Sequence, residues 1–338
     1  MGHKRVHESA AVWTIYHAID SETANPFQAY QATRYVDTAI PHIPVTAHGL
    51  KENGYATIAT TNWLPYSWSI NNVAFAEVMH TALSYFQAGR ADAGYKLLKS
   101  SVLDGMYLGD SPGNFGQISF YDAARGECYR DFGDPIGVAS RVLIQGLFGI
   151  LPDALNQQII LRPGFPDDWD KASVSTPDIS YRFTRKEDTD TYHITQRFQT
   201  PLHPVLQINA RKEKIRSVKV NGVPATWQSI ESAHGYPLLS IQAEGTSSTT
   251  ITIEWEGASL HTLAVQELVI ASNGKLALQI PSGASISQVY DPQSVLANHT
   301  VEATAFNAQI KGEPGHHTFF VYTHQGVNGF GGNLLISI

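Results

Sequence analysis

Residues 111–134 form a polar segment rich in carboxylates and arginines, and glycoside hydrolysis uses these residue types. Cleavage of a glycosidic bond needs one carboxyl group as an acid and a second as a base or nucleophile. A neighbouring arginine keeps a carboxylate ionised, whereas burial raises the pKa of a carboxyl group. We therefore predict that Glu127 and Asp131 are the catalytic residues. The charged side chains of the segment are Asp122, Arg125, Glu127, Arg130, Asp131 and Asp134.

Simpler roles compete with catalysis in this segment. Asp131 could pair with a neighbouring arginine, as exposed carboxylates often do. Asp134 stands directly before Pro135 and fits a helix N-cap better than a catalyst. Glu127 lacks an obvious capping or helix-pairing role, so it is the first choice among the acids.

A second segment, residues 60–72, combines aromatic and amide side chains. Sugars present apolar C–H faces and hydroxyl edges, so aromatic rings stack on the faces while amides and charged groups bind the edges. The alternative is that the tryptophans belong to the core and that Asn71 or Ser69 caps the following helix. The segment as a whole favours a sugar-binding loop. The predicted sugar-binding residues are Trp63, Tyr66, Trp68, Asn71 and, from the acidic segment, Arg130.

The apolar periodicity of residues 1–150 predicts helices that would position both segments. Two of them are separated only by Gly89-Arg90 and would form an αα-hairpin. Asn25-Pro26 and Asp134-Pro135 each fit an N-cap followed by proline at the first helical position. The expected helices cover about 8–19, 27–40, 72–89, 91–103 and 134–150.

The pattern changes after residue 150. Prolines, glycines and an acidic pair in residues 151–175 indicate a linker or an irregular strand. Apolar and polar residues alternate from 176 to 338, and Asn221-Gly222 and Ser272-Asn273-Gly274 are hairpin turn signals. Roughly twelve strands without a helix-length periodic segment predict an antiparallel β-sandwich region. A break near Gly257 would divide it into two modules.

Composition argues against several classes of protein. The net charge is −7, and lysines and arginines form no long stripe, so we expect no nucleic-acid or anionic-membrane partner. No apolar run reaches the length of about 18 residues that a membrane-spanning helix needs. Cys128 is the one cysteine and the histidines lack metal-site spacing, so we expect no metal and no cofactor. No secretion signal follows Met1; a periplasmic or secreted location would require one in a longer protein.

Residues 141–169 resemble the junction at the end of an (α/α)6 toroid in six-hairpin glycosidases and disaccharide phosphorylases. In those families the last toroid helix ends in a short apolar run with glycine. A Pro-Asp turn, a strand and a proline-rich segment with tryptophan follow. The corresponding residues here are 145–150, Pro152-Asp153, 159–161 and 163–169. The predicted hairpin at 68–103 is also similar, as are the motifs HESAAxWTIYHAID, TNWxPYSWSINN and RDFGD of a bacterial family of large proteins in this superfamily.

The resemblance implies an α+β fold class in sequence order, in which helical hairpins of a partial (α/α)6 toroid precede an antiparallel β-sandwich. Glucoamylase-like inverting members carry the general base as a glutamate in the loop before the last toroid helix. This implies that Glu127 is the base, with Asp131 as its substitute. Related phosphorylases hold phosphate with a small-residue loop at the same helix. Asp134 would repel phosphate there, which favours hydrolysis.

The resemblance therefore implies an inverting glycoside hydrolase with a carbohydrate ligand. A non-catalytic carbohydrate-binding or scaffold protein is the first alternative, and a sugar phosphorylase is the second. Residues 1–150 would supply only part of a closed toroid. We therefore expect the missing half to come from a longer chain, a partner chain or a second copy in a homodimer. No residue is assigned as the general acid.

Overall fold

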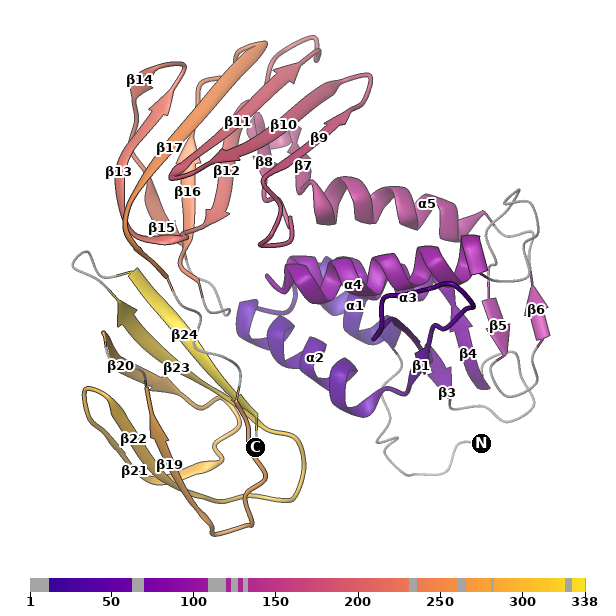
Figure 1. Ribbon diagram of the computed structural model, residues 1–338, viewed down its shortest axis with the longest axis vertical. Helices are drawn as coiled ribbons and strands as arrows, with labels where there is room; N and C mark the ends of the chain where they lie inside the picture. Colours follow the sequence, from indigo (N-terminus) through magenta and orange to yellow (C-terminus); the bar gives the residue numbers. More distant parts are fainter. Residues whose placement is uncertain are drawn as a thin grey trace. The chain divides into compact units, whose positions relative to one another are not determined.

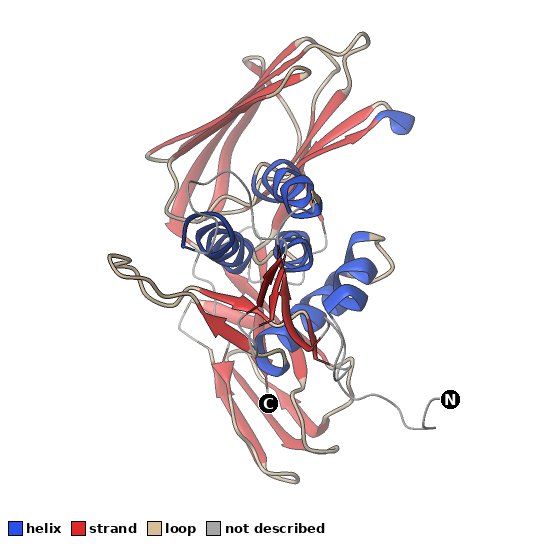
Figure 2. Cartoon of the chain, turned by 90° about the vertical axis from the view of Figure 1, so that its right-hand side faces the viewer, coloured by secondary structure: helices blue, strands red, loops and turns tan. Residues whose placement is uncertain are grey.

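The computed structural model describes residues 12–62, 70–108, 120–122, 127–129, 133–230, 236–260, 266–280, 283–325 and 330–337. For residues 61–62, 70–72, 120–122, 127–129, 266–267 and 330–337 it describes the backbone only. The chain divides into two compact units. The first consists of Met1–Ile150 and Pro163–Asp167, and the second of Leu151–Arg162 and Asp168–Ile338. All the described α-helices belong to the first unit, and the second is built mainly from strands (Figure 2).

The helix ends in the first unit follow from local sequence. Helix α2 begins with a capping box: the Asn25 side chain accepts from the Gln28 N–H at 2.9 Å, and the Gln28 side chain accepts from the Asn25 N–H at 3.0 Å. Pro26 takes the first helical position, and the helix ends before Pro41, as predicted. The helices are α1 (Val12–Asp20), α2 (Pro26–Ala39), α3 (Phe75–Gln87), α4 (Ala91–Val102), α5 (Asp134–Arg141) and the π-helical turns η1 (Leu103–Leu108) and η3 (Val142–Leu147).

The predicted αα-hairpin is confirmed as α3 and α4. Phe86, near the end of α3, makes its closest packing contacts with glycines. Gly89 turns the chain between the helices with a φ of 76°. The Phe86 ring lies against three glycines that are far apart in the sequence. A Cβ atom added to Gly94, Gly146 or Gly164 would lie 3.0, 2.6 or 2.4 Å from that ring. Glycine is needed at these positions because the ring occupies the space of a side chain.

Short strands accompany the helices of the first unit. Strands β1 (His42–Pro44) and β2 (Ala56–Ile58) form an antiparallel pair. A four-stranded antiparallel sheet has the order β3-β4-β5-β6. Strand β4 runs directly into α3, so this sheet lies at the N-terminal end of that helix (Figure 1). The four strands are Thr61–Asn62, Ile70–Ala74, Phe120–Asp122 and Glu127–Tyr129.

The first part of the second unit holds two sheets. The six-stranded sheet has the order β14-β13-β17-β11-β10-β9, and the five-stranded sheet has the order β15-β16-β12-β8-β7. Burial alternates along β10, β11 and β17, whose buried residues include Tyr181, Ile194 and Trp255, so these strands turn one face toward a core. Asn221 and Gly222 form the predicted β13–β14 hairpin with φ of 51° and 81°. The elements are β7 (Ile150–Asp153), the 3-10 turn η4 (Ala154–Asn156), β8 (Gln158–Leu161), β9 (Lys171–Ser175), β10 (Ile179–Lys186), β11 (Thr189–Gln196), β12 (His203–Asn209), β13 (Lys212–Val220), β14 (Val223–Pro224), β15 (Gln228–Ile230), β16 (Leu238–Gln242) and β17 (Ser248–Ser259).

The remaining strands form a four-stranded sheet, β18-β24-β23-β20, and a three-stranded sheet, β19-β22-β21. Leu278, Phe306 and Phe319 belong to one buried apolar cluster of these strands. The predicted turn at Asn273 exists, but the predicted hairpin does not, because β19 pairs with β22 instead of with the residues before the turn. The strands are β18 (Gln266–Glu267), β19 (Lys275–Gln279), β20 (Ala284–Tyr290), β21 (Leu296–Val301), β22 (Ala305–Ile310), β23 (Thr318–Gln325) and β24 (Phe330–Ser337).

The predicted fold class is wrong. Among the described residues, strands outnumber helices, and the five described α-helices form no toroid of helical hairpins. The strands of the first unit have only two to five residues, too few to show a clear alternation, so the stronger helical periodicity dominated the prediction. The β region is not purely antiparallel either, because β8 pairs in parallel with β12, and β18 with β24.

The predicted division at residues 150 and 175, with a further break near Gly257, stays a prediction. Residues 151–175, which we expected to form a linker, contain most of β7 and all of η4, β8 and β9. The chain also returns to the first unit at Pro163–Asp167. The origin of a missing toroid half likewise stays untested.

Candidate active site

The four-stranded sheet of the first unit joins the backbones of the two segments that the sequence singled out. Asn72 on β4 is paired with Asp122 on β5, and Asp122 is paired with Glu127 on β6. The strand that carries Asn71 and the strand that carries Glu127 are therefore separated by one strand. The sheet therefore brings Asn71 and Glu127, which are 56 positions apart in the sequence, onto nearby strands.

The predicted site residues themselves are only partly described. Asn71 and Glu127 lie on β4 and β6, of which the backbone is known at these positions. Their predicted roles in sugar binding and catalysis stay predictions. The other predicted residues lie outside the described part of the chain: Trp63, Tyr66, Trp68, Arg130 and Asp131.

Glu77 lies in the first turn of α3, three residues after the end of β4. Burial raises the pKa of its carboxyl group, a hydrogen bond with Thr60 lowers it, and the negative charge of Asp134 raises it, with a net pKa of about 7. Its Oε2 atom is buried and has no hydrogen-bond partner among the described residues. Glu77 therefore keeps its proton to a much higher pH than an exposed glutamate does.

Thr60 holds this carboxyl group in place. The Thr60 side chain is buried, and its hydroxyl oxygen accepts a hydrogen bond of 3.1 Å from the N–H of Ala74. Ala74 is the residue directly before α3. Because Thr60 also bonds to Glu77, it ties the chain before β3 to the start of the helix.

His80 lies one turn after Glu77 on α3. Burial and the positive charge of Arg141 lower the pKa of its imidazole, although Asp20 acts in the opposite direction. The ring of Tyr16 lies 4.8 Å from the His80 ring, measured between centroids. Burial and the charge of Glu77 raise the pKa of the Tyr16 phenol to about 12. At neutral pH, this part of the site therefore presents an uncharged imidazole and an uncharged phenol.

Asp20 and Arg141 form an ion pair, and both charges act on His80. Two nitrogens of the Arg141 guanidinium donate to the two Asp20 oxygens at 2.9 and 2.6 Å, and the Gln87 amide donates to Asp20 at 2.9 Å. Burial alone would raise the pKa of Asp20, but the hydrogen bonds from Arg141 and Gln87 outweigh it and lower the pKa. These bonds connect α1, α3 and α5. We call the residues Tyr16, Asp20, Glu77, His80, Gln87 and Arg141 the polar seam.

Asp134 is not the helix N-cap that the sequence predicted. The N-cap of α5 is Gly133, Asp134 is the first helical residue, and no side chain caps this end. Its carboxylate is therefore not used as a cap and instead adds negative charge near Glu77. An acid in the first turn still suits the helix dipole.

Glu77 and His80 are not among the site residues that the sequence predicted. An acid within a predicted amphipathic helix usually needs no functional explanation, because it is expected on the polar side. The available signal was the pair Glu77 and His80, three residues apart on one helix face, directly after the aromatic segment. Only the packing of α1 and α5 against that face shows that the pair is partly buried.

The side chains of this site can transfer a proton and form hydrogen bonds. Glu77 can donate a proton near neutral pH, and the uncharged His80 and Tyr16 can take part in hydrogen bonds. Within the described ranges, no group of three or more histidine, cysteine, aspartate or glutamate side chains is arranged to hold a metal ion. None of the described helices is both long and apolar enough to cross a membrane.

Comparison with known proteins finds a likeness at the level of structure but not of sequence. No family model matches the sequence, and no curated protein matches it. The structure of an alpha-L-rhamnosidase from Dictyoglumus thermophilum is similar over 54% of this chain and 21% of that chain, with 12% sequence identity and a TM-score of 0.34. This chain therefore spans about a fifth of the length of that glycosidase.

Proposed function

We propose that this chain is part of a carbohydrate-active enzyme, an inverting glycoside hydrolase in which Glu77 is the general acid. The observation that carries the proposal is a partly buried glutamate with a pKa of about 7, at the end of the sheet that contains β4 and β6. A general acid works best when its pKa lies near the working pH, because it must hold a proton and release it readily. Inverting glycosidases raise the pKa of their acid in this way.

Each residue has a defined role in the proposed reaction. Glu77 donates its proton to the glycosidic oxygen as the bond from that oxygen to the anomeric carbon breaks. The Glu127 carboxylate, or Asp131 in its place, removes a proton from a water molecule that attacks the anomeric carbon from the opposite face. Inversion requires the two carboxyl groups to lie about 6.5–9.5 Å apart, which leaves room for the water.

The surrounding residues would set the pKa of Glu77 and bind the sugar. Asp134 keeps the pKa of Glu77 raised, and Thr60 orients its carboxyl group. The aromatic and amide residues Trp63, Tyr66, Trp68 and Asn71, with Arg130, would bind the sugar. Support for this arrangement comes from the backbone pairing that joins the two segments.

The test separates the acid from the base by the leaving group. Glu77→Gln and Glu127→Gln are made in the active full-length protein and assayed on the preferred glycan and on dinitrophenyl glycosides. A dinitrophenolate departs without protonation, so Glu77→Gln should lose about 10²–10⁴-fold of kcat on the glycan but little on the activated substrate. Glu127→Gln should lose activity on both. Equal activity of wild type and Glu77→Gln on the glycan rules out Glu77 as the acid.

The same assays address the other functions. NMR of the first-formed product should show an inverted anomeric centre, and retention would exclude this mechanism. Turnover that requires inorganic phosphate would indicate a phosphorylase. Glycan binding without any hydrolysis would indicate a carbohydrate-binding or scaffold protein, in which Glu77 is a structural residue.

A further inference from the structure

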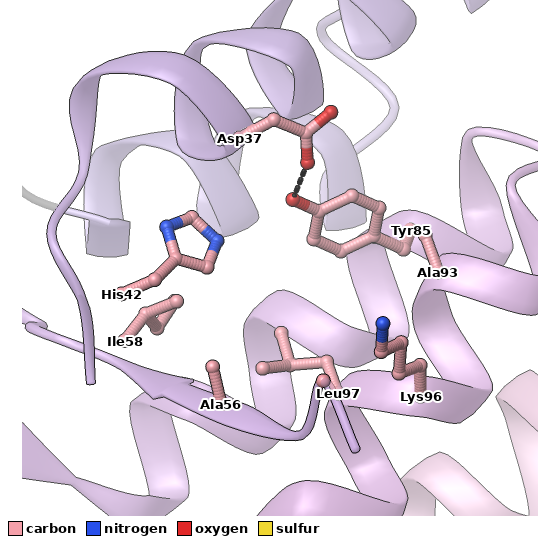
Figure 3. A pocket seen from close by; sticks show the side chains of 9 residues that line it. Asp37, His42, Ala56, Ile58, Tyr85, Ala93, Lys96 and Leu97 are labelled. Atoms are coloured by element: carbon pink, nitrogen blue, oxygen red, sulfur yellow. Dashed lines mark hydrogen bonds between the residues drawn. The ribbon is translucent and has the colours of Figure 1, made fainter. Parts of the chain in front are cut away.

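A cavity of about 170 Å³ lies in the first unit, where α2, α3, α4 and the β1–β2 pair meet. None of its lining residues belongs to the polar seam. Figure 3 shows four polar side chains around a common space, contributed by Asp37, His42, Tyr85 and Lys96. Apolar side chains complete the wall: Ala56, Ile58, Ala93 and Leu97.

The Asp37 carboxylate is already occupied by the protein. One oxygen accepts from the Tyr85 hydroxyl at 2.5 Å, and the other accepts from Arg34 at 2.7 Å and from Arg90 at 2.6 Å. Two guanidinium groups therefore balance this single negative charge. Lys96 lines the cavity, and the two arginines lie directly behind its wall. Three positive charges therefore surround one carboxylate, and the cavity favours an anion.

Lys96 is the cation that a ligand can reach. Its side chain is exposed, and it makes no ion pair with any residue in the described ranges. Gly54 lies beside it with a φ of 84°, and a Cβ atom added there would lie 3.1 Å from the Lys96 Nζ atom. Lys99, almost one turn later, instead donates to Glu52 at 2.7 Å. The chain thus leaves the Lys96 ammonium open on the cavity side.

His42 contributes a hydrogen-bond acceptor, whereas Lys96 contributes a donor. Its Nδ1 atom lies 2.9 Å from the carbonyl oxygen of Ile40, which can only accept a hydrogen bond. Nδ1 therefore carries the hydrogen, which leaves Nε2 as the ring nitrogen that can accept one. A ligand that fits both ends needs an anionic acceptor for Lys96 and a hydroxyl donor for His42.

We propose that this cavity binds a small hydroxy acid about one six-membered ring in size, such as a hexuronate. Its carboxylate would lie against Lys96, a hydroxyl group would donate to His42 Nε2, and its C–H face would pack on Ile58 and Leu97. The cavity has room for the ring of such a ligand, because an engineered protein cavity of about 150 Å³ holds a benzene ring. This proposal is independent of the catalytic role of Glu77.

Calorimetric titration of the whole protein with three probes tests the proposal. D-glucuronate has both recognition groups, D-glucose lacks the carboxylate, and cyclohexanecarboxylate lacks the hydroxyl groups. D-glucuronate should bind roughly tenfold more tightly than either of the others, which is the size of one lost charged hydrogen bond. No binding of D-glucuronate, or equal binding of all three probes, overturns the proposal.

Variants locate the binding. Lys96→Met removes the ammonium group, keeps the side-chain stem and should weaken D-glucuronate binding about tenfold. Lys99→Met on the same helix is the matched control and should bind like the wild type. His42→Leu should reduce the preference for D-glucuronate over cyclohexanecarboxylate. Glu77→Gln should bind normally, which separates this site from the proposed active site. Equal effects of Lys96→Met and Lys99→Met overturn the assignment.

Discussion

Glu77 shows how opposing local influences set the chemistry of one residue. Burial and the charge of Asp134 favour the protonated carboxyl group, whereas the hydrogen bond from Thr60 favours the carboxylate. The N-terminal end of α3 would also favour the carboxylate. Burial dominates, because the side chain is partly buried where α3 packs against α1 and α5. The net result is an acid whose pKa, about 7, suits proton donation at neutral pH.

Removing the charge of Asp134 should move the pH dependence of activity. The proposed acid works only when protonated, so kcat should fall as the pH rises through about 7. Asp134→Asn removes an influence that raises the pKa of Glu77, so this fall should occur at lower pH. The pH–rate profile on an unactivated glycan measures it. Asp92→Asn, an exposed acid in the first turn of α4, should leave the profile unchanged. An identical profile for Asp134→Asn would contradict the electrostatic role.

Glu77 should also make stability depend on pH. Its pKa is about 7 in the folded protein against 4.5 as a free side chain, so folding binds its proton more tightly. This stabilisation is complete below about pH 4.5 and is lost as the pH rises through about 7, with an upper bound of roughly 3 kcal/mol. Urea unfolding of Glu77→Gln should lack this decrease relative to the wild type. Glu22→Gln, the same change at an exposed glutamate, should keep it. A wild-type slope in Glu77→Gln would show that the carboxyl group is solvated.

At the scale of elements, two kinds of contact hold the helices of the first unit together. The polar seam connects α1, α3 and α5 through charge-assisted hydrogen bonds. The Phe86 ring provides an apolar contact in which a large side chain at the end of α3 fills the space that three glycines leave. The second contact depends on close approach, so it should tolerate added volume poorly.

Gly164→Ala should therefore destabilise the protein. Its Cβ would lie 2.4 Å from the Phe86 ring and 2.9 Å from the carbonyl oxygen of Gly146, so the ring and backbone must shift. We expect a loss of about 1–3 kcal/mol in the free energy of unfolding. Gly137→Ala is the control: it lies within α5 with no atom near its added Cβ, and should stabilise by about 0.5–1 kcal/mol. Chemical denaturation compares the two. Similar effects would mean that Phe86 moves aside readily.

At the scale of the whole molecule, the two units have separate cores. The first is built around α3, and the second includes a buried charge cluster on the six-stranded sheet. Asp190 is 2% exposed and accepts from Arg185 at 3.1 Å, from Arg211 at 3.2 Å and from the Trp255 indole at 2.9 Å. Separate cores are expected to unfold in separate steps.

Scanning calorimetry with one variant in each unit should resolve these steps. Asp190→Ala leaves two arginines and an indole N–H without their partner, and should cost the second unit roughly 3–5 kcal/mol. Gly164→Ala should lower only the transition of the first unit. Gly137→Ala again serves as the control for the first. A single transition that both destabilising variants shift equally would show that the units unfold together.

Local sequence determined the features that depend on neighbouring residues. The N-cap at Asn25, the α3–α4 hairpin and the Asn221-Gly222 turn follow from side chains a few positions apart, and the structure confirms them. Residue types alone also identified the two segments, 60–72 and 111–134, in which we predicted the site residues. Only the tertiary structure showed which strands pair and that the helices form no toroid. It also showed that Glu77 is partly buried and lies near Asp134. Strand pairing and burial depend on residues distant in the sequence, so periodicity and spacing carry little information about them.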